Sequence, residues 1–287
     1  MIRPVRKAVF PVAGLGTRLL PATKTMPKEM LTIVDRPLIQ YAVDEAREAG
    51  IEQLIFVTGR GKSSLVDYFD MSFELEATMT RAGKSLDSLA SSRTEYGEIV
   101  SVRQQQPLGL GHAVWCARHV VGDEPFAVLL PDDLMVGRPG ALRQMIDAYH
   151  SIGGNIVCAA DVPADKTASY GIVTPGASSG NRTEVRGLVE KPKPADAPST
   201  LGVIGRYILQ PEVMRALDAQ ETGAGGEIQL TDAMAKLIGT QLFHAVTVDA
   251  KRFDCGTKLG FVSANMMLGM ADSEIGGALR ELANDAK

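Results

Sequence analysis

The chain has 287 residues, of which 45% are hydrophobic and 22% are charged, the usual proportions of a globular protein with a large core. Its formal net charge of −4, without any basic stripe in the sequence, argues against a nucleic-acid partner. The cysteines lie far apart and no run reaches the roughly 18 apolar residues of a membrane helix, so we expect a cytoplasmic protein without disulfides, a zinc site or membrane contact.

A loop rich in glycine and basic residues follows the first predicted strand. The apolar residues 8–13 indicate a buried β-strand. The next residues include two glycines, a threonine and three cations: Gly14, Gly16, Thr17, Arg18, Lys24 and Lys28. Glycines allow a close backbone approach and present N–H groups to phosphate oxygens, and several cations suit a polyphosphate. We therefore predict a phosphate-binding loop, the alternative being a glycine turn with basic surface residues.

Neither of two common phosphate motifs accounts for this loop. A dinucleotide-binding G-x-G-x-x-G would need a glycine where Leu19 stands, and a long helix behind it, which Pro21 prevents. A Walker A motif ending at Gly61 and Lys62 would need a glycine in place of Phe56. We expect Lys62 to be a solvated loop residue.

The segments that follow predict an α/β sheet. Residues 38–49 have an amphipathic helix pattern ended by Gly50, and residues 51–59 indicate a strand. Residues 70–95 are polar and indicate a solvated, partly helical excursion, before another strand over 99–103. Strands that alternate with helices are typical of a parallel sheet covered on both faces.

A run of glutamines precedes the next predicted helix. Gln104 and Gln105 are followed by a turn at residues 107–109 and a helix rich in alanine and valine. A glutamine amide offers both a donor and an acceptor, as the edge of a uracil or thymine ring requires. The alternative is an exposed polar run before a helix. We expect His112 to be a helix-start residue rather than a general base.

Two acidic residues follow the apolar strand predicted over 126–130. Asp132 and Asp133 come directly after Pro131, at the carboxyl end of that strand. In open α/β sheets the ligand crevice lies outside this end of the strands, and carboxylates are good Mg²⁺ ligands. The pair therefore predicts a metal site, the alternative being a turn or a helix cap.

The second half of the chain predicts a helix over 139–151, a strand over 156–160 and then two strands of a small β-rich region. These two strands, within ASYGIVTPG and EVRGLVEKPKP, bring Gly171 near Glu190 and Lys191. A glutamate can accept hydrogen bonds from sugar hydroxyls, and a lysine can neutralise a phosphate. The alternative for E-K-P is an ordinary solvated strand end.

The C-terminal part of the chain adds a further acidic candidate. An amphipathic helix is predicted over 225–239, between strands over 202–209 and 245–248. Glu227, at the start of that helix, either assists a site or balances the helix dipole. Asp254 follows the last strand in a loop.

Several segments together resemble a known family. GLGTR, LPATK and PKEML resemble the N-terminal signature of the sugar-nucleotidyltransferases, and PKEMLTIVDRPLIQY resembles the bacterial members that act on UTP and glucose 1-phosphate. The resemblance implies a Rossmann-like, mostly parallel central sheet with helices on both faces and a small appended β-rich sugar-binding region. One domain then spans 1–287, with 1–135 mainly for the nucleotide, 136–256 mainly for the sugar phosphate, and two C-terminal helices over 257–287 as an oligomer contact.

The resemblance also implies a reaction and a site. The expected reaction is transfer of the uridylyl group of UTP to α-D-glucose 1-phosphate, giving UDP-glucose and pyrophosphate, by a homotetramer built as a dimer of dimers. The residues implied for catalysis are Arg18, Lys28 and Lys191. Those implied for the nucleotide are Ala13, Gly14, Gly16, Thr17, Glu29, Gln105 and Gly109. Those implied for the sugar phosphate are Gly171, Glu190 and Lys191, with Asp132 and Asp254 for Mg²⁺.

Three other functions remain open at this point. A related nucleotidyltransferase using dTTP or another sugar 1-phosphate would share the chemistry. A nicotinamide-dependent oxidoreductase is disfavoured by Leu19 and Pro21. A non-catalytic nucleotide sensor would bind UTP without releasing pyrophosphate.

Overall fold

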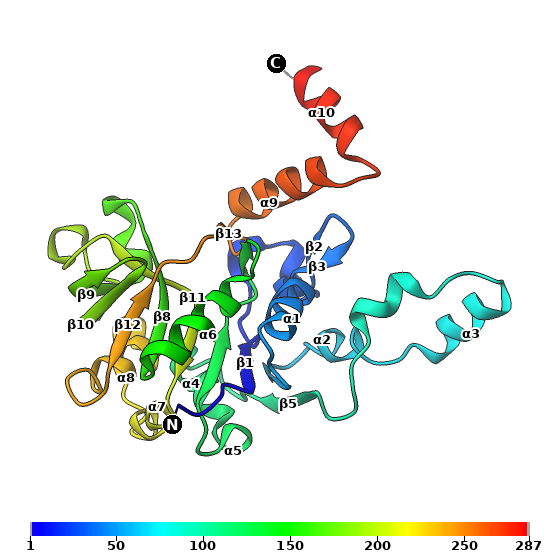
Figure 1. The fold of residues 1–287 in the computed structure, drawn as a ribbon. Helices are drawn as coiled ribbons and strands as arrows, with labels where there is room; N and C mark the ends of the chain where they lie inside the picture. Colours follow the sequence, from blue (N-terminus) through cyan, green and yellow to red (C-terminus); the bar gives the residue numbers. More distant parts are fainter. Residues whose placement is uncertain (1, 286–287) are drawn as a thin grey trace.

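The computed structural model describes residues 2–285, and within that range a nine-stranded sheet crosses the middle of the molecule (Figure 1). Its strand order is β5-β4-β1-β6-β11-β8-β12-β10-β9. The strands are β1 (Lys7–Pro11), β4 (Gln53–Thr58), β5 (Ile99–Arg103), β6 (Phe126–Leu129), β8 (Asn155–Asp161), β9 (Gly171–Ser179), β10 (Arg182–Glu190), β11 (Leu201–Leu209) and β12 (Phe243–Val246). Short ribbons pair β2 (Thr32–Ile33) with β3 (Arg36–Pro37), and β7 (Asp133–Val136) with β13 (Lys251–Asp254).

The sheet is parallel in its N-terminal part and mixed beyond it. Strands β5, β4, β1 and β6 run parallel, whereas β11 is antiparallel to both β6 and β8. The predicted β-rich region is the far end of this sheet: β10 pairs with β9 and β12, and Ile172 of β9 pairs back to Gly202 of β11. The predicted α/β class is confirmed, and its β-rich part continues the central sheet.

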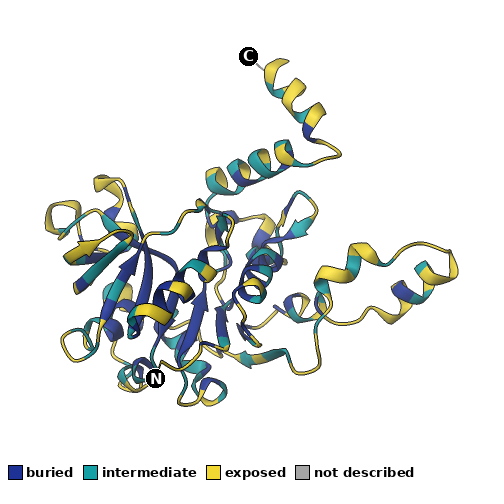
Figure 2. Ribbon diagram, viewed as in Figure 1, coloured by how far each residue is buried: buried dark blue, intermediate teal, exposed yellow. Residues whose placement is uncertain are grey.

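Alternate side chains of β1 enter two cores on opposite faces of the sheet. Ala8 and Phe10 pack with residues of α1 (Leu38–Glu48), α2 (Ser64–Asp67) and α6 (Ala141–Ile152). Val9 packs with residues of α4 (Leu110–Cys116), α5 (Arg118–Val121), α7 (Glu212–Leu217) and α8 (Leu230–Ala235). Because successive strand side chains point to opposite faces, helices cover the sheet on both sides. Figure 2 shows the strands as the buried centre of the molecule.

The polar segment 70–95 lies outside these cores, as predicted. It contains α3 (Phe73–Arg81) and the 3₁₀ segment η4 (Asp87–Ser92), and it projects from the body, mostly exposed (Figures 1 and 2). Arg47 of α1 ties its return to the body through the Glu98 carboxylate, at 2.7 and 2.9 Å, and the Ser91 carbonyl. The segment buries little of its own surface, so these hydrogen bonds of Arg47 help attach it to the body.

The two helices predicted after Lys258 are confirmed as α9 (Lys258–Ala271) and α10 (Gly276–Asp285). Both extend beyond the globular body in Figure 1, although Ala264 of α9 is buried beside Leu134 and Phe253. Large apolar side chains of the two helices and of the turn between them remain exposed: Leu259, Val262, Met266, Ile275 and Leu282. Among residues 2–285, no helix is both long and apolar enough to cross a membrane.

The structure differs from the sequence prediction at several elements. The helix expected over 225–239 is shorter, because Gly225 and Gly226 take positive φ angles of 73° and α8 begins only at Leu230. Helix α7 and the β7–β13 ribbon were not predicted. The ribbon matters most, because it carries Asp133 at one end and Asp254 opposite to it.

Candidate active site

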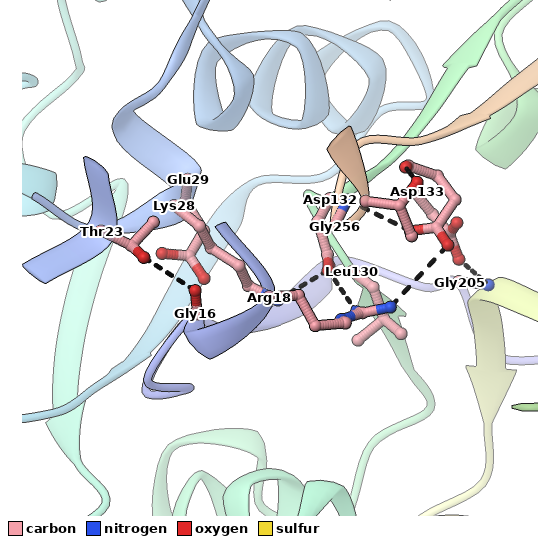
Figure 3. Close-up of polar contacts among 12 residues, drawn as sticks. Gly16, Arg18, Thr23, Lys28, Glu29, Leu130, Asp132, Asp133, Gly205 and Gly256 are labelled. Carbon is pink, nitrogen blue, oxygen red and sulfur yellow. Dashed lines mark hydrogen bonds and ion pairs between the residues drawn. The ribbon is translucent and has the colours of Figure 1, made fainter. Parts of the chain in front are cut away.

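The glycine-rich loop between β1 and α1 is compact but not helical. Three short 3₁₀ turns, η1 (Thr17–Leu19), η2 (Ala22–Lys24) and η3 (Lys28–Met30), replace a continuous helix. Gly16 has a φ of 67°, and its carbonyl accepts a 2.7 Å hydrogen bond from the Thr23 hydroxyl (Figure 3). Gly14 is exposed, and a Cβ there would meet nothing within 4 Å. The loop thus offers open backbone for a close ligand approach.

Two cations of this loop meet the acid that follows β6. The Nζ atom of Lys28 lies 2.6 Å from Oδ2 of Asp132, and the Arg18 guanidinium lies 3.9 Å from the same oxygen. Arg18 also lies 3.9 Å from Oδ2 of Asp254. The structure therefore brings together four predicted residues from three separate parts of the chain.

The charges of Lys28 and Asp132 hold each other in the ionised state. Burial alone would raise the pKa of Asp132, but the Lys28 ammonium overrides it and holds that pKa below its ordinary value. Burial alone would lower the pKa of Lys28, but Asp132 and Glu29 raise it above its ordinary value. Both groups are consequently charged at neutral pH.

The β7–β13 ribbon places the Asp132 and Asp254 carboxylates beside each other. Asp254 pairs in register with Asp133, and the Cys255 N–H donates to the Asp132 carbonyl at 2.7 Å. A Cβ on Gly256 would lie 2.8 Å from Oδ2 of Asp132 and 3.0 Å from Oδ1 of Asp254. Glycine at position 256 therefore leaves free the space that both carboxylates face.

These two carboxylates fit a hard divalent cation. Oxygen ligands suit Mg²⁺, which is usually held by one or two carboxylates together with water and substrate phosphates. Among residues 2–285, no group of three or more His, Cys, Asp and Glu side chains is arranged to hold a metal. The donor set of Asp132 and Asp254 thus matches a site that is completed by substrate.

The Asp133 side chain is bonded to other groups of the protein. Its side chain is buried, with Oδ1 2.7 Å from Nε of Arg252 and Oδ2 accepting from the Gly205 N–H at 3.0 Å. Burial raises the pKa of Asp133, although Arg252 opposes the shift. The sequence analysis paired Asp133 with Asp132 as a candidate metal ligand. In the structure Asp133 instead holds the Arg252 side chain and the Gly205 backbone.

A cleft of about 990 Å³ joins the two halves of the site. Predicted residues that line it are Arg18, Asp132, Asp133, Gly171, Glu190, Lys191, Glu227 and Asp254. Gly171 and Glu190 face each other in the β9–β10 register, as predicted, and the Lys191 Nζ lies 3.3 Å from Oε1 of Glu190. A Cβ on Gly171 would lie 2.9 Å from Oγ1 of Thr231, so a side chain there would crowd the cleft wall. A second concavity, of about 1020 Å³ over the β9–β10 hairpin tip, contains none of these residues.

The two glutamines after β5 differ in burial, which the sequence analysis did not predict. Gln105 is exposed, whereas Gln104 is buried and its Nε2 lies 3.1 Å from the Gly109 carbonyl and 3.0 Å from Nδ1 of His112. The alternation of β5 continues to this point, since the Gln104 N–H donates to Thr58 of β4. Counting alternate residues from β5 would have pointed Gln104 inward and Gln105 outward.

Gly109 lies where a side chain cannot fit. Its φ is 112°, and a Cβ there would lie 2.8 Å from the Cβ of Glu227. The Ile228 N–H donates to the Leu108 carbonyl at 2.7 Å, which joins this loop to the one carrying Glu227. Burial and the nearby Arg118 lower the pKa of His112, so His112 is neutral at pH 7 and can accept from Gln104.

The expectation that Lys62 is solvated is wrong. Its Nζ lies 2.9 Å from Oε2 of Glu29, and both side chains are buried. Burial raises the pKa of Glu29 even though Lys62 opposes the shift. The loop after β4 folds under the glycine-rich loop, a contact that local sequence patterns do not reveal. Glu29, predicted to contact the nucleoside, faces Lys62 in this structure.

This chain is similar to known proteins over most of its length. A family model described as nucleotidyl transferase matches residues 7–270. UTP–glucose-1-phosphate uridylyltransferase from Komagataeibacter xylinus is 55% identical over 90% of this chain and 92% of its own. The protein of that name from Bacillus subtilis (strain 168) is 49% identical over 96% of this chain and 94% of its own.

Two solved structures are also similar to this chain. A UTP-bound UGPase from Acinetobacter baumannii is 45% identical, with a TM-score of 0.89 over 99% of this chain and 100% of its own. A UDP-glucose pyrophosphorylase complexed with UDP-glucose is 42% identical, with a TM-score of 0.82 over 91% of this chain and 97% of its own.

Proposed function

Because this chain belongs to the nucleotidyl transferase family, we propose that it transfers the uridylyl group of UTP to α-D-glucose 1-phosphate, forming UDP-glucose and pyrophosphate. The observation that carries the proposal is the single cleft lined by Arg18, Asp132, Lys191 and Asp254. The relatives that share nearly the whole length of the chain bear the name of this activity, and the similar solved structures hold UTP or UDP-glucose.

The reaction needs no nucleophilic side chain. A phosphate oxygen of glucose 1-phosphate, already ionised near neutral pH, forms a bond to the α-phosphorus of UTP. The bond from that phosphorus to the bridging oxygen breaks, and pyrophosphate leaves with the electron pair. Two polyanions repel each other in a cleft of low dielectric, so the protein must neutralise charge and hold the reactants in line.

Three cations of this chain have separate tasks in that scheme. Arg18 and Lys28 bind the triphosphate, where the glycine-rich loop brings them to the end of β6. Lys191, which follows the end of β10, binds the phosphate of the incoming sugar phosphate. Glu190 and Gly171, which face each other in the β9–β10 register, contact the hexose. Asp132 and Asp254 would hold Mg²⁺, which supplies positive charge to the phosphates when bound.

The nucleoside binds against the open backbone of the first loop and the loop after β5. We assign the first of these surfaces to Ala13, Gly14, Gly16 and Thr17, of which Gly14 and Thr17 are exposed and Ala13 is buried. Glu29 supports this surface through its pair with Lys62. We assign base recognition to the segment from Gln104 to Gly109. Gln105 is the residue that the resemblance favours, and Gln104 is the one whose amide is held beside Gly109.

The wider organisation follows from the same proposal. Residues 1–135 serve mainly the nucleotide, residues 136–256 mainly the sugar phosphate, and the helices of 257–287 meet another subunit. The exposed apolar side chains of α9 and α10 support that subunit contact, in a cytoplasmic homotetramer built from dimers.

One assay tests the activity. Purified protein with UTP, glucose 1-phosphate and Mg²⁺ is expected to release pyrophosphate and form UDP-glucose. Parallel reactions with dTTP, ATP and GTP measure the choice of base, and other sugar 1-phosphates measure the choice of sugar. A protein that binds UTP but releases no pyrophosphate would be a nucleotide sensor, and the proposed function would be wrong.

A further inference from the structure

Arg252 lies between the two halves of the cleft. It is two residues before Asp254 on β13, so both side chains project from the same face of the β7–β13 ribbon. Its side chain lines the cleft and is 21% exposed. Strand β13 therefore bears both Asp254, a proposed metal ligand, and Arg252, whose guanidinium extends toward the part of the cleft that we assign to the sugar phosphate.

One end of the Arg252 guanidinium is fixed by Asp133. Its Nε and NH2 atoms lie 2.7 and 2.5 Å from Oδ1 of Asp133. The other oxygen of Asp133 accepts from the Gly205 N–H at 3.0 Å. A Cβ on Gly205 would lie 2.6 Å from this oxygen, so β11 packs tightly against the carboxylate. A planar guanidinium held by a buried, fully bonded carboxylate has little freedom to reorient.

The other end of Arg252 reaches Tyr170. NH1 donates to the Tyr170 hydroxyl at 3.2 Å, and the guanidinium carbon lies 5.2 Å from the centre of the Tyr170 ring. Both a hydrogen bond and a cation–π contact therefore hold the tyrosine. Tyr170 directly precedes Gly171 at the start of β9.

Tyr170 in turn holds the backbone of Lys191. The Tyr170 carbonyl accepts from the Lys191 N–H at 2.9 Å. Lys191 has a φ of 48°, in the left-handed region, which a residue with a side chain adopts only when its surroundings hold it there. The direction of the Lys191 side chain thus depends on where Tyr170 is placed.

We propose that Arg252 is a positioning residue which holds Tyr170, and through it Lys191, so that the Lys191 ammonium meets the incoming sugar phosphate. This inference rests on the proposed function and adds to it a link between the metal-binding edge and the sugar-phosphate loop. Because Arg252 bonds to both Asp133 and Tyr170, the position of Tyr170 depends on that of Asp133, the neighbour of Asp132.

Arg252→Lys and Tyr170→Phe test the link without leaving Asp133 unpaired. Lysine keeps a positive charge beside Asp133 but lacks the rigid fork that also reaches Tyr170. Phenylalanine keeps the ring and removes the hydroxyl. For each variant we expect the KM for glucose 1-phosphate to rise roughly threefold to tenfold, the range of a single lost hydrogen bond, with a lower kcat. The KM for UTP and the melting temperature should change little.

The double variant distinguishes a link from two independent effects. If Arg252 acts through Tyr170, the Arg252→Lys/Tyr170→Phe protein should be no worse than the more affected single variant. Multiplicative effects would mean that each side chain meets the substrate by itself and would overturn the proposal. Unchanged KM for glucose 1-phosphate in either single variant, or an equal rise in the KM for UTP, would overturn it as well.

A matched control and the parent protein keep the two proposals separate. Arg186→Lys alters an arginine that pairs with Glu184 on β10 outside the cleft, and it should leave both KM values unchanged. If the unaltered protein forms no UDP-glucose, the proposed function fails. If that protein is active and the Arg252→Lys protein matches it, only the positioning role of Arg252 fails.

Discussion

Lys28 and Asp132 form an ion pair, with Nζ 2.6 Å from Oδ2, at the point where the glycine-rich loop reaches the carboxyl end of β6. Arg18 approaches the same oxygen at 3.9 Å. In this arrangement Lys28 is the counter-ion of a carboxylate that we assign to Mg²⁺. The loop that we propose for the triphosphate is thereby held against the edge of the sheet that we assign to the metal.

Lys28→Met is expected to lower turnover roughly 100-fold or more, because a positioned cation is lost from the transition state. It should also change how stability depends on pH. The lowered pKa of Asp132 gives stability that is present above about pH 4 and lost as the pH falls through that lowered value. The raised pKa of Lys28 gives stability that is lost only as the pH rises through that raised value, above its ordinary 10.5.

Urea unfolding in a chelating buffer measures this prediction. The parent protein should exceed the Lys28→Met protein in free energy of unfolding at neutral pH, and the difference should shrink below about pH 4. A difference that stays constant down to pH 3 would show that the pair does not supply the stability.

Asp132→Asn and Asp133→Asn should separate activity from stability. Asp132→Asn removes a proposed metal ligand and should reduce Mg²⁺-supported turnover roughly 100-fold with a folded protein. Asp133→Asn leaves the Arg252 guanidinium without its buried partner and should lower the free energy of unfolding by about 3 kcal/mol. Turnover and denaturant unfolding of both variants measure these effects. An Asp133→Asn protein that is as stable as the parent but inactive would contradict the structural role that we assign to Asp133.

Gln104→Ala and Gln105→Ala test which glutamine supports base recognition. Gln104 holds the Gly109 carbonyl, so its loss should raise the KM for UTP roughly tenfold. Gln105 is exposed, so its amide is open to the base, and its loss should also raise that KM, by roughly threefold to tenfold, because one hydrogen bond to the base is lost. Steady-state kinetics with UTP and CTP provide the measurement. An unchanged KM for UTP in the Gln105→Ala protein would exclude Gln105 from base recognition, and an unchanged KM in the Gln104→Ala protein would exclude a supporting role for Gln104.

Lys191→Ala should raise the KM for glucose 1-phosphate at least tenfold and lower kcat, because a charge on the incoming phosphate is left unbalanced. UTP binding should survive, since Lys191 directly follows β10, in the part of the cleft that we assign to the sugar phosphate. Initial rates with each substrate varied in turn, and calorimetry with UTP alone, measure the two effects. Normal kinetics for glucose 1-phosphate would remove Lys191 from the mechanism.

Lys62→Met should lower the free energy of unfolding by about 3 kcal/mol, because the buried Glu29 carboxylate loses its partner. Changing both residues, as Glu29→Gln/Lys62→Met, should recover part of the loss, since no uncompensated charge is then buried. Lys24→Met, at an exposed position in the glycine-rich loop that carries Glu29, is the control for removing a lysine. Equal stability of the Lys62→Met and Lys24→Met proteins would refute a structural role for the buried pair.

The elements that the sequence predicted well depend on neighbours along the chain. The strand over Ile99–Arg103, the helix beginning at Leu38 and the β9–β10 hairpin all follow from periodicity and turn residues. The same patterns predicted a helix that begins too early, at Gly225. The apolar spacing favoured a helix there, but Gly225 and Gly226 take positive φ angles that a helix does not allow.

The sequence by itself determined the class of fold, the family and the acidic and basic residues from which a phosphate-transfer site is built. Only the tertiary structure decided that Asp132 faces the cleft while Asp133 braces Arg252, and that Lys62 lies buried against Glu29. The physical reason is range: strand and helix periodicities arise between adjacent residues. The partner of each charged side chain is instead set by the register of β7 with β13 and by loops that meet from distant parts of the chain.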